Sequence, residues 1–322
     1  MTDLAAPAAP AAPPFVPLDP LCRWAGGKGP LLARAGHRLP RPEKARGYRE
    51  PFVGAGALFF GRYYGVRPAI LADTNPHLIA TYLTIRDAPE ALLFELDPAR
   101  NTYSREDFEA AREDLNNHPG APLLLRARWF LTVLAWGFNG LWRVNRDGAC
   151  NTPFGKPSKE GTIPKLVDPA HILALSRALQ GADILLAPFE ESTRDVREDE
   201  VIYLDPPYAP MSFTAKFTSY TADGFTYARP APRGQGALFD HQEAARSEIG
   251  HWASLRRRLV SLHKAGAHWI LSQAATPEMK RDLAGLYTIE LDVPRTISSK
   301  TTTREPVPEL LVSNRPFPAG SL

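Results

Sequence analysis

The sequence predicts an α/β fold in which an open sheet is interrupted by a long, mostly helical insertion. Within residues 48–60 a short strand ends in a glycine turn and runs into an apolar helix, and a second apolar strand follows at 69–73. This strand–turn–helix–strand order is typical of nucleotide-binding α/β sheets. The alternation stops near residue 87 and resumes with apolar runs at 184–186 and 201–204. We therefore expect one sheet built from two separated parts of the chain.

Composition limits the class of protein. The chain has 322 residues, of which 44% are hydrophobic and 23% charged, and these values are typical of a globular chain with one large or two small domains. No apolar run approaches the ~20 residues that span a bilayer. Residues 1–20 are rich in Ala and Pro without the features of a secretion signal, so we expect a disordered tail. The two cysteines, Cys22 and Cys150, form no metal-binding spacing, which favours a reducing cytoplasm and no metal.

The glycine turn predicts a ligand that contains adenosine. Gly54 and Gly56 supply the first two glycines of a dinucleotide-binding turn, whereas Phe59 stands where a third glycine is expected. Asp73 ends the second strand 19 residues after Gly54. This distance is close to the ~20-residue offset of a carboxylate that binds ribose hydroxyls. Taken alone, the turn is a weak indication of a nicotinamide cofactor; together with Asp73 it indicates adenosine.

The turn Asp205-Pro206-Pro207-Tyr208 predicts chemistry on an amino group. It follows the apolar run 201–204, so an acid and an aromatic ring stand at the carboxyl end of a strand, where open α/β sheets bind ligands. The prolines have nearly fixed backbones and no N–H donors. The Asp205 carboxylate and the Pro206 carbonyl can accept both protons of an amino group on a planar base while Tyr208 stacks on the ring. We predict that this turn holds the exocyclic amine of a nucleobase for methylation; an ordinary turn is the alternative.

Residues 88–181 differ in character from the rest of the chain. A Gly-punctuated loop at 136–148 carries aromatic, Asn and Arg residues, which suit base-edge reading and phosphate contact. Between residues 122 and 166 seven basic residues stand against two acidic ones, although the whole chain has a net charge of only +3. We predict an inserted recognition domain for nucleic acid. The alternatives are a solvated charged face and a surface hairpin with its own small core, to which we assign Trp129 and Trp136.

The other elements are predicted from apolar periodicity and turn residues. We expect helices from Asn75-Pro76 to about 86, at 103–115, at 123–135 and at 240–264, and strands at 269–272, 287–293 and 309–312. Arg256-Arg257-Arg258 is interpreted as a solvated helix face. Residues 213–226 are expected to fold over the Asp-Pro-Pro-Tyr turn, followed by a flexible insertion at 227–236. The segment 295–304 mixes hydroxyls with bases, which indicates either a phosphate-contacting loop or a Ser/Thr-rich linker.

Six motifs occur in an order that resembles one enzyme family. They are Trp24-Ala25-Gly26-Gly27-Lys28, Glu50-Pro51-Phe52-Val53-Gly54-Ala55-Gly56, Leu71-Ala72-Asp73-Thr74-Asn75, Phe138-Asn139-Gly140-Leu141, Asn151-Thr152-Pro153-Phe154-Gly155 and Asp205-Pro206-Pro207-Tyr208. The set resembles the Dam-type (D12 class, group alpha) DNA adenine-N6 methyltransferases from about Leu21 to Val312. The resemblance implies the Rossmann-like sheet of class I S-adenosylmethionine-dependent methyltransferases. It also implies a catalytic domain at 21–87 and 182–316 and a mostly helical target-recognition domain at 88–181.

The resemblance further implies two ligands and the residues that contact them. The cofactor of the family is S-adenosylmethionine, placed against Trp24, Lys28, Phe52, Gly54, Gly56, Asp73 and Asp205. Double-stranded DNA, with a site like GATC, is placed against Arg23, Phe138, Asn139, Leu141, Arg143, Asn145, Pro153, Arg295 and Ser298. Arg23 and Phe138 differ from the Lys and Tyr of well-known members, which leaves the outer base of the site open, and residues 227–238 add length.

The implied reaction is methyl transfer to the N6 amino group of adenine, catalysed by Asp205, Pro206, Pro207 and Tyr208. Because the target base lies inside a duplex, it has to be flipped out. Cytosine-N4 methylation, methylation of a protein amide and DNA binding without catalysis stay open as alternatives; Ser or Asn in place of Asp205 would have favoured the first two. We expect a monomeric, cytoplasmic protein that associates with the nucleoid through DNA and uses neither membrane nor metal. A cognate restriction endonuclease is left open as a partner.

Overall fold

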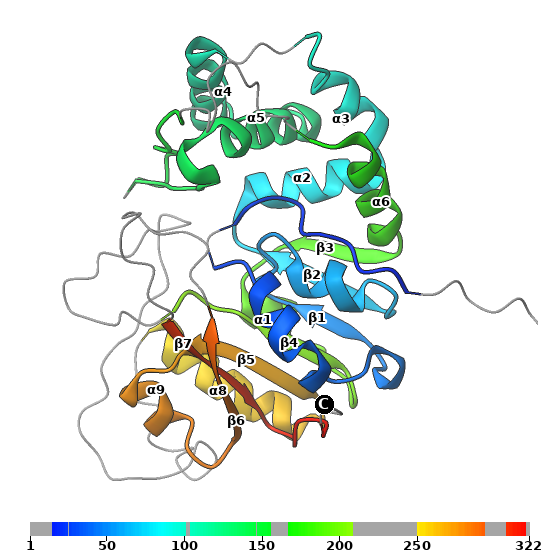
Figure 1. Ribbon diagram of the computed structural model, residues 1–322, viewed down its shortest axis with the longest axis vertical. Coiled ribbons are helices and arrows are strands. Elements are labelled where there is room, and N and C mark those ends of the chain that lie inside the picture. Colours follow the sequence, from blue (N-terminus) through cyan, green and yellow to red (C-terminus); the bar gives the residue numbers. More distant parts are fainter. Residues whose placement is uncertain are drawn as a thin grey trace, which may run out of the picture.

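The computed structural model describes residues 15–24, 26–100, 104–145, 147–155, 167–208, 250–293 and 307–319. Its centre is a seven-stranded sheet in the order β3-β2-β1-β4-β5-β7-β6 (Figure 1). The strands are β1 Tyr48–Glu50, β2 Ala69–Asp73, β3 Ala182–Leu186, β4 Val201–Leu204, β5 His268–Ala274, β6 Tyr287–Val293 and β7 Val307–Ser313. Strands β1 to β5 are parallel to one another, whereas β7 is antiparallel to β5 and β6. The predicted α/β fold is confirmed.

Helices cover the sheet and form the insertion. They are α1 Gly29–Ala35, α2 Pro76–Asp87, α3 Pro89–Glu95, α4 Arg105–Asn117, α5 Leu123–Trp136, α6 Pro169–Leu179, α7 Phe189–Ser192, α8 His251–Lys264 and α9 Pro277–Asp282, with short helices η1 Gly36–Arg38, η2 Pro42–Lys44, η3 Phe59–Tyr63 and η4 Phe138–Gly140. The start of α2 is as predicted, because the Asn75 side chain accepts hydrogen bonds from the backbone N–H groups of His77 and Leu78. The apolar helix expected after the glycine turn passes into a π-helix, η3, rather than continuing as an α-helix.

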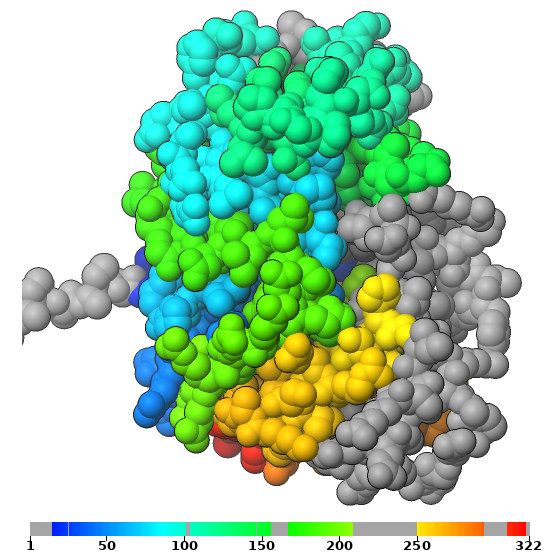
Figure 2. Space-filling view, turned by 180° about the vertical axis from the view of Figure 1, so that it is seen from behind, coloured from blue at the N-terminus to red at the C-terminus, as the bar shows by residue number. Residues whose placement is uncertain are grey.

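The sheet is buried on both faces, which explains why β4 is apolar at every position. Side chains alternate along a strand, so Tyr203 joins one core while Ile202 and Leu204 join the other. The first core includes side chains from α1, α2, α5 and α6. The second lies against α8 and α9 and takes in Phe189 of α7. Figure 2, which views the molecule from behind, shows α8 in yellow at the surface beside the light green segment that carries α7.

The insertion stacks on the sheet through α2. Helices α3, α4 and α5 lie at one end of the molecule, and α2 lies between them and the strands (Figure 1). Helix α2 contacts α5 on one side and β2 and β3 on the other. Phe108 of α4 and Phe130 of α5 therefore belong to the same core cluster as Leu71 of β2. Because this core is continuous, the division into domains at 87/88 and 181/182 stays a prediction.

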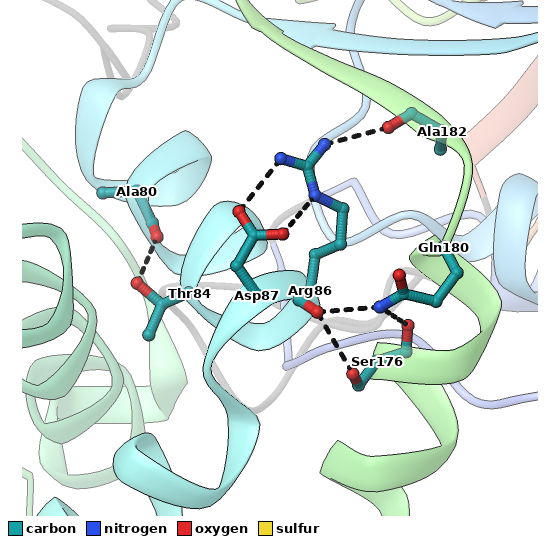
Figure 3. Close-up of polar contacts among 7 residues, drawn as sticks. All are labelled: Ala80, Thr84, Arg86, Asp87, Ser176, Gln180 and Ala182. Atoms are coloured by element: carbon teal, nitrogen blue, oxygen red, sulfur yellow. Dashed lines mark hydrogen bonds and ion pairs between the residues drawn. The ribbon is translucent and has the colours of Figure 1, made fainter.

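The two ends of the insertion lie side by side. The Arg86 backbone carbonyl, near the end of α2, accepts a hydrogen bond of 2.8 Å from the Gln180 side-chain amide after α6 (Figure 3). The Arg86 guanidinium donates to the Ala182 carbonyl at 3.0 Å and also pairs with Asp87. The chain therefore leaves the sheet region and returns to it at one place, so the insertion leaves the order of the parallel strands intact.

The prediction of a solvated face at Arg256-Arg257-Arg258 is partly wrong, and several other predictions concern residues outside the described part of the chain. Arg256 is only 9% exposed, on a helix, α8, that contacts β5 and α7. Arg257 is exposed as expected. Arg258 is partly exposed and donates a hydrogen bond of 2.8 Å to the Glu190 carbonyl. The loop at 213–226, the insertion at 227–238 and the segment 295–304 lie outside the described residues, as do residues 1–14. Among the described residues, no helix combines the length and the apolar character needed to cross a bilayer.

Candidate active site

The candidate site lies where the direction of the sheet order reverses. Strand β1 neighbours both β2 and β4, so the chain runs outward from the β1–β4 pair toward both edges. Open α/β sheets bind ligands at the carboxyl ends of the strands beside such a point. Glu50 is the last residue of β1, Asp73 is the last of β2, and Asp205 follows β4 directly. The fold therefore brings three acids from three separate motifs to one edge of the sheet.

Only one of the two carboxylate oxygens of Asp205 has a partner among the described residues. Its Oδ2 atom lies 2.7 Å from Lys28 Nζ, and its side chain is 19% exposed. Its Oδ1 atom is buried and, among the described residues, has no hydrogen-bond partner. The pKa of Asp205 is raised to about 6 as the net result of three influences: burial raises it, the charge of Lys28 lowers it, and the charge of Glu309 raises it. An unpaired buried carboxylate oxygen is costly, and this atom can accept a further hydrogen bond.

Tyr208 is fixed at both its hydroxyl and its ring. The hydroxyl donates a hydrogen bond to Glu309 Oε1, and the ammonium of Lys28 lies over the ring, 4.9 Å from its centroid. Lys28 Nζ is also 3.8 Å from Glu309 Oε1. The sequence analysis missed Glu309. In the sequence, Glu309 stands out only as a charged residue in a mostly apolar strand. The contact of Glu309 with Tyr208 depends on the position of β7 in the sheet.

Glu50 is a second acid that the sequence analysis left without a role. It is 3% exposed and accepts a hydrogen bond of 2.7 Å from the Tyr48 hydroxyl. Burial raises the pKa of Glu50 to about 8; the hydrogen bond from Tyr48 lowers it and the charge of Asp205 raises it. Among the described residues, Lys28 Nζ lies 2.7 Å from Asp205 and 3.8 Å from Glu309, and the charge of Asp205 acts on Glu50. With its pKa raised to about 8, Glu50 is largely protonated at neutral pH and adds little negative charge to the site.

The glycine turn is held in place by Asp73 and Tyr82. Asp73 Oδ2 accepts from the Gly54 backbone N–H at 3.1 Å, and Asp73 Oδ1 accepts from the Asn75 backbone N–H at 2.9 Å. The Tyr82 hydroxyl donates to the Gly54 carbonyl at 2.7 Å. Both Gly54 and Gly56 have positive φ, at 46° and 74°, a conformation that favours glycine. Asp73 therefore braces the turn, and its contact with ribose hydroxyls stays a prediction.

Aromatic rings flank the glycine turn. A Cβ placed on Gly54 would lie 3.0 Å from the Trp24 indole, so the indole covers the turn. Phe52 stacks on Phe189 with ring centroids 5.6 Å apart and planes inclined by 28°. Phe52 is partly exposed, whereas Phe189 is buried. The sequence analysis did not single out Phe189, which follows β3 and reaches Phe52 only because the sheet places β3 and β1 on either side of β2.

The residues predicted to face DNA gather on a small hairpin. Antiparallel bridges join Gly137 to Phe154 and Val144 to Cys150. The residues of the hairpin that were predicted to contact DNA and that are exposed are Phe138, Asn139, Arg143 and Pro153, while Leu141 and Asn145 are partly exposed. The Arg143 guanidinium donates to the Asn151 side chain at 2.8 Å and to the Asn151 carbonyl at 3.0 Å. These bonds hold Arg143 in one orientation.

Arg23 joins this hairpin from a distant part of the sequence. A Cβ placed on Gly140 would lie 3.3 Å from Arg23 Cβ, and Arg23 is exposed. Asn139 has φ 56° and Gly140 has φ 64°, so the backbone turns sharply here and presents the Phe138 ring, which is 48% exposed. Arg295 and Ser298 lie outside the described residues. The fold thus brings together Arg23 and the hairpin, as the resemblance implied.

Comparison with known proteins agrees with this arrangement. The family model for the D12 class N6 adenine-specific DNA methyltransferases matches residues 24–242. The chain belongs to this family. It is 34% identical over 297 residues to the DNA adenine methylase of Vibrio cholerae (serotype O1, strain ATCC 39541), covering 90% of this chain and 93% of that protein. It is 31% identical over 310 residues to the DNA adenine methylase of Escherichia coli (strain K12), covering 91% and 94%.

A further relative bears a different kind of name. The chain is 30% identical over 302 residues to the Type II methyltransferase M1.LlaDCHI of Lactococcus lactis subsp. cremoris, covering 92% of this chain and 95% of that protein. The family and these relatives make the chain a DNA adenine-N6 methyltransferase, as the sequence predicted. Its sheet agrees with the class I methyltransferase fold. A methylation reaction requires a methyl donor and, in this family, DNA as the substrate.

Proposed function

We propose that this D12-class enzyme transfers a methyl group from S-adenosylmethionine to the N6 amino group of an adenine flipped out of duplex DNA, at a site like GATC. The observation that carries the proposal is the buried Asp205 Oδ1 atom, which no described residue pairs. It lies at the carboxyl edge of the sheet, beside the Tyr208 ring and a Lys28 ammonium that already occupies the other oxygen. An adenine amino group would give this oxygen its missing donor.

The residues beside the glycine turn fit the cofactor. Positive φ at Gly54 and Gly56 lets a ligand approach the backbone closely, and the partly exposed Phe52 ring offers a stacking surface. In the proposal, Trp24, Phe52 and the turn hold the adenosine, and the brace Asp73 is close enough to the turn to accept ribose hydroxyls. The Lys28 ammonium pairs with Asp205 at 2.7 Å and lies 3.8 Å from Glu309, so in the proposal Lys28 faces the cofactor from beside Asp205. S-adenosylmethionine would supply a methyl group that its sulfonium has already activated.

Asp205 and the Pro206 carbonyl would make the amine a better nucleophile. The lone pair of an adenine amino group is delocalised into the ring, so the nitrogen has to become tetrahedral before it attacks. Two acceptors on its N–H bonds favour this geometry. The interaction strengthens as positive charge develops on the nitrogen, so the acceptors stabilise the transition state more than the ground state. The Pro-Pro backbone holds both acceptors still, which avoids reorganisation during the reaction.

Base flipping would be supported by the ring and by the hairpin. Extruding a base costs a few kcal/mol, and stacking on an aromatic ring returns about 1–3 kcal/mol. Tyr208 offers that ring, and the Lys28 ammonium lies over it, 4.9 Å from the ring centroid. The exposed Phe138 and Asn139 at the tip of the hairpin would enter the duplex, while Arg23 and Arg143 would contact bases or phosphates.

The finer predictions about partners are also part of the proposal. A GATC-like site rests on the resemblance of the hairpin and of Arg23 to the family. A restriction endonuclease partner is suggested by a relative whose name is that of a Type II methyltransferase. We propose a monomer that acts on nucleoid DNA in the cytoplasm.

The experiment that tests the proposal compares Asp205→Ala with the wild-type chain. In a host that lacks DNA methylation, the wild-type chain is expected to produce N6-methyladenine and Asp205→Ala none. Purified Asp205→Ala should still bind duplex DNA, because the residues predicted to contact DNA are Arg23 and those of the hairpin rather than Asp205. Asp183→Ala is the matched control, since Asp183 is exposed on the edge strand β3, and it should methylate normally. Retained transfer by Asp205→Ala would remove Asp205 from the mechanism. Detection of N4-methylcytosine instead of N6-methyladenine in the wild-type host would make cytosine the substrate.

A further inference from the structure

Glu309 of β7 lies next to the site but outside every motif of the sequence analysis. We infer that Glu309 is a positioning residue that holds the Tyr208 ring in the plane on which the flipped adenine stacks. The inference rests on the proposed function, because it assumes that Tyr208 receives the base. It assigns Glu309 no contact with substrate or cofactor; Glu309 acts through the Tyr208 hydroxyl.

The anchor for Tyr208 comes from the rigid part of the fold. In the register of the sheet, Glu309 is opposite Ala274 of β5 and Leu291 of β6, so β7 is hydrogen-bonded on both sides at this position. Glu309 is 6% exposed, and its Oε1 atom accepts the hydrogen bond from the Tyr208 hydroxyl. A carboxylate on a paired central strand moves little. It is therefore a fixed point to which a side chain on a turn can be attached.

Tyr208 needs such a fixed point because it is on a turn rather than on a strand. Strand β4 ends at Leu204, and three residues separate it from Tyr208. The χ2 torsion of tyrosine is broad, so the rotamer alone does not fix the ring plane. The hydrogen of a phenolic hydroxyl lies in the plane of its ring because the oxygen is conjugated with it. An acceptor that holds this hydrogen therefore favours one ring plane as well as one position of the ring tip. Stacking demands one ring plane, so a freely rotating ring loses entropy when a base arrives. The bond to Glu309 would restrict this freedom before DNA binds.

A different role for Glu309 would be that of a counter-charge to Lys28. The distances favour the tyrosine, since Glu309 Oε1 is 3.8 Å from Lys28 Nζ, whereas Lys28 Nζ is only 2.7 Å from Asp205. Lys28 is therefore paired without Glu309. The two roles predict different behaviour of Glu309→Gln, because glutamine keeps an acceptor for the hydroxyl but removes the charge.

The test uses Glu309→Gln, Glu309→Leu, Tyr208→Phe and the double variant Tyr208→Phe/Glu309→Leu. Duplex DNA carries 2-aminopurine at the target position, a base that is bright when unstacked and quenched when it stacks on a ring. We expect Glu309→Leu and Tyr208→Phe each to leave the flipped base brighter and to lower kcat/KM for DNA about tenfold. We expect the double variant to be no worse than either single variant, and Glu309→Gln to stay within about threefold of wild type.

Two outcomes would overturn the inference. In the first, the losses of Glu309→Leu and Tyr208→Phe multiply in the double variant, so that the two residues act separately. In the second, Glu309→Gln is as poor as Glu309→Leu, so that the charge of Glu309 is what matters. A folding defect is detected by thermal unfolding, and Tyr208→Phe removes only one oxygen. If wild type methylates adenine and Asp205→Ala does not, either outcome refutes the role of Glu309 and leaves the proposed function standing.

Discussion

Replacing Lys28 by methionine should move the acid limb of the pH–rate profile to higher pH. Methionine keeps most of the apolar stem of lysine and removes its charge. Lys28 Nζ lies 2.7 Å from Asp205 Oδ2, and its charge is the largest influence that lowers the Asp205 pKa. The wild-type Asp205 pKa is about 6. Because ionised Asp205 is the acceptor in the proposed mechanism, the rate falls as this carboxylate becomes protonated.

The size of the shift follows from the contact. An opposite charge this close lowers a carboxyl pKa by about 1–3 units, so we expect the limb to rise by about 2 pH units, equivalent to about 3 kcal/mol. At a pH of about 7.5, the ionised fraction of Asp205 would fall from nearly all to about a quarter. The single-turnover rate at that pH should then be about fourfold lower. At a pH of about 9.5, most of the rate should return.

The assay is the single-turnover rate of methyl transfer at saturating DNA and methyl donor, between about pH 5 and about pH 9.5. Saturation separates the charge effect from any loss of donor affinity. Lys44→Met is the matched control, because Lys44 is an exposed lysine of η2, and its profile should stay unchanged. Glu309→Gln should move the limb in the opposite direction, because the charge of Glu309 raises the Asp205 pKa. A limb that stays in place or moves to lower pH in Lys28→Met would refute the coupling between Lys28 and Asp205.

Two further changes test the surroundings of the site. Burial raises the pKa of Glu50 from 4.5 in the unfolded chain to about 8 in the fold, so the folded state binds the extra proton. The stability that this group contributes is therefore greatest below a pH of ~4.5 and is lost as the pH rises through ~8. The melting temperature of wild type should drop over this window, and Glu50→Gln should drop less. An equal dependence of the melting temperature on pH in the two proteins would contradict the raised pKa. Gly56→Ala would place a Cβ 2.7 Å from the Phe60 ring at φ 74°, so about 2–4 kcal/mol of stability should be lost in urea unfolding. Gly65→Ala, where a Cβ meets nothing within 4 Å, is its control and should cost far less.

The local sequence was sufficient for most of the elements. Strands β2, β4 and β6 begin and end where the apolar runs do, because β-branched and apolar runs bounded by turn residues need no distant information. Helix α2 begins at the predicted Asn-Pro boundary, since the cap is formed within three residues. The glycine turn and the Asp-Pro-Pro-Tyr turn were equally readable, because Gly and Pro act on their own backbone.

The tertiary structure decided which side chains meet. Lys28 precedes α1 and Glu309 is on β7, yet both reach the turn after β4. Glu309 does so because β7 is antiparallel to β5, which brings the amino end of β7 to the carboxyl edge of the parallel strands. A slip of one residue in the β5–β7 register would turn Glu309 to the other face. Burial of Arg256 and the raised pKa of Glu50 likewise depend on what the fold places around them. The sequence by itself thus determined the elements and the chemical groups, because these follow from short-range preferences. Strand order and register determined the cluster of charges around Asp205, because contacts between distant residues exist only once the sheet is assembled.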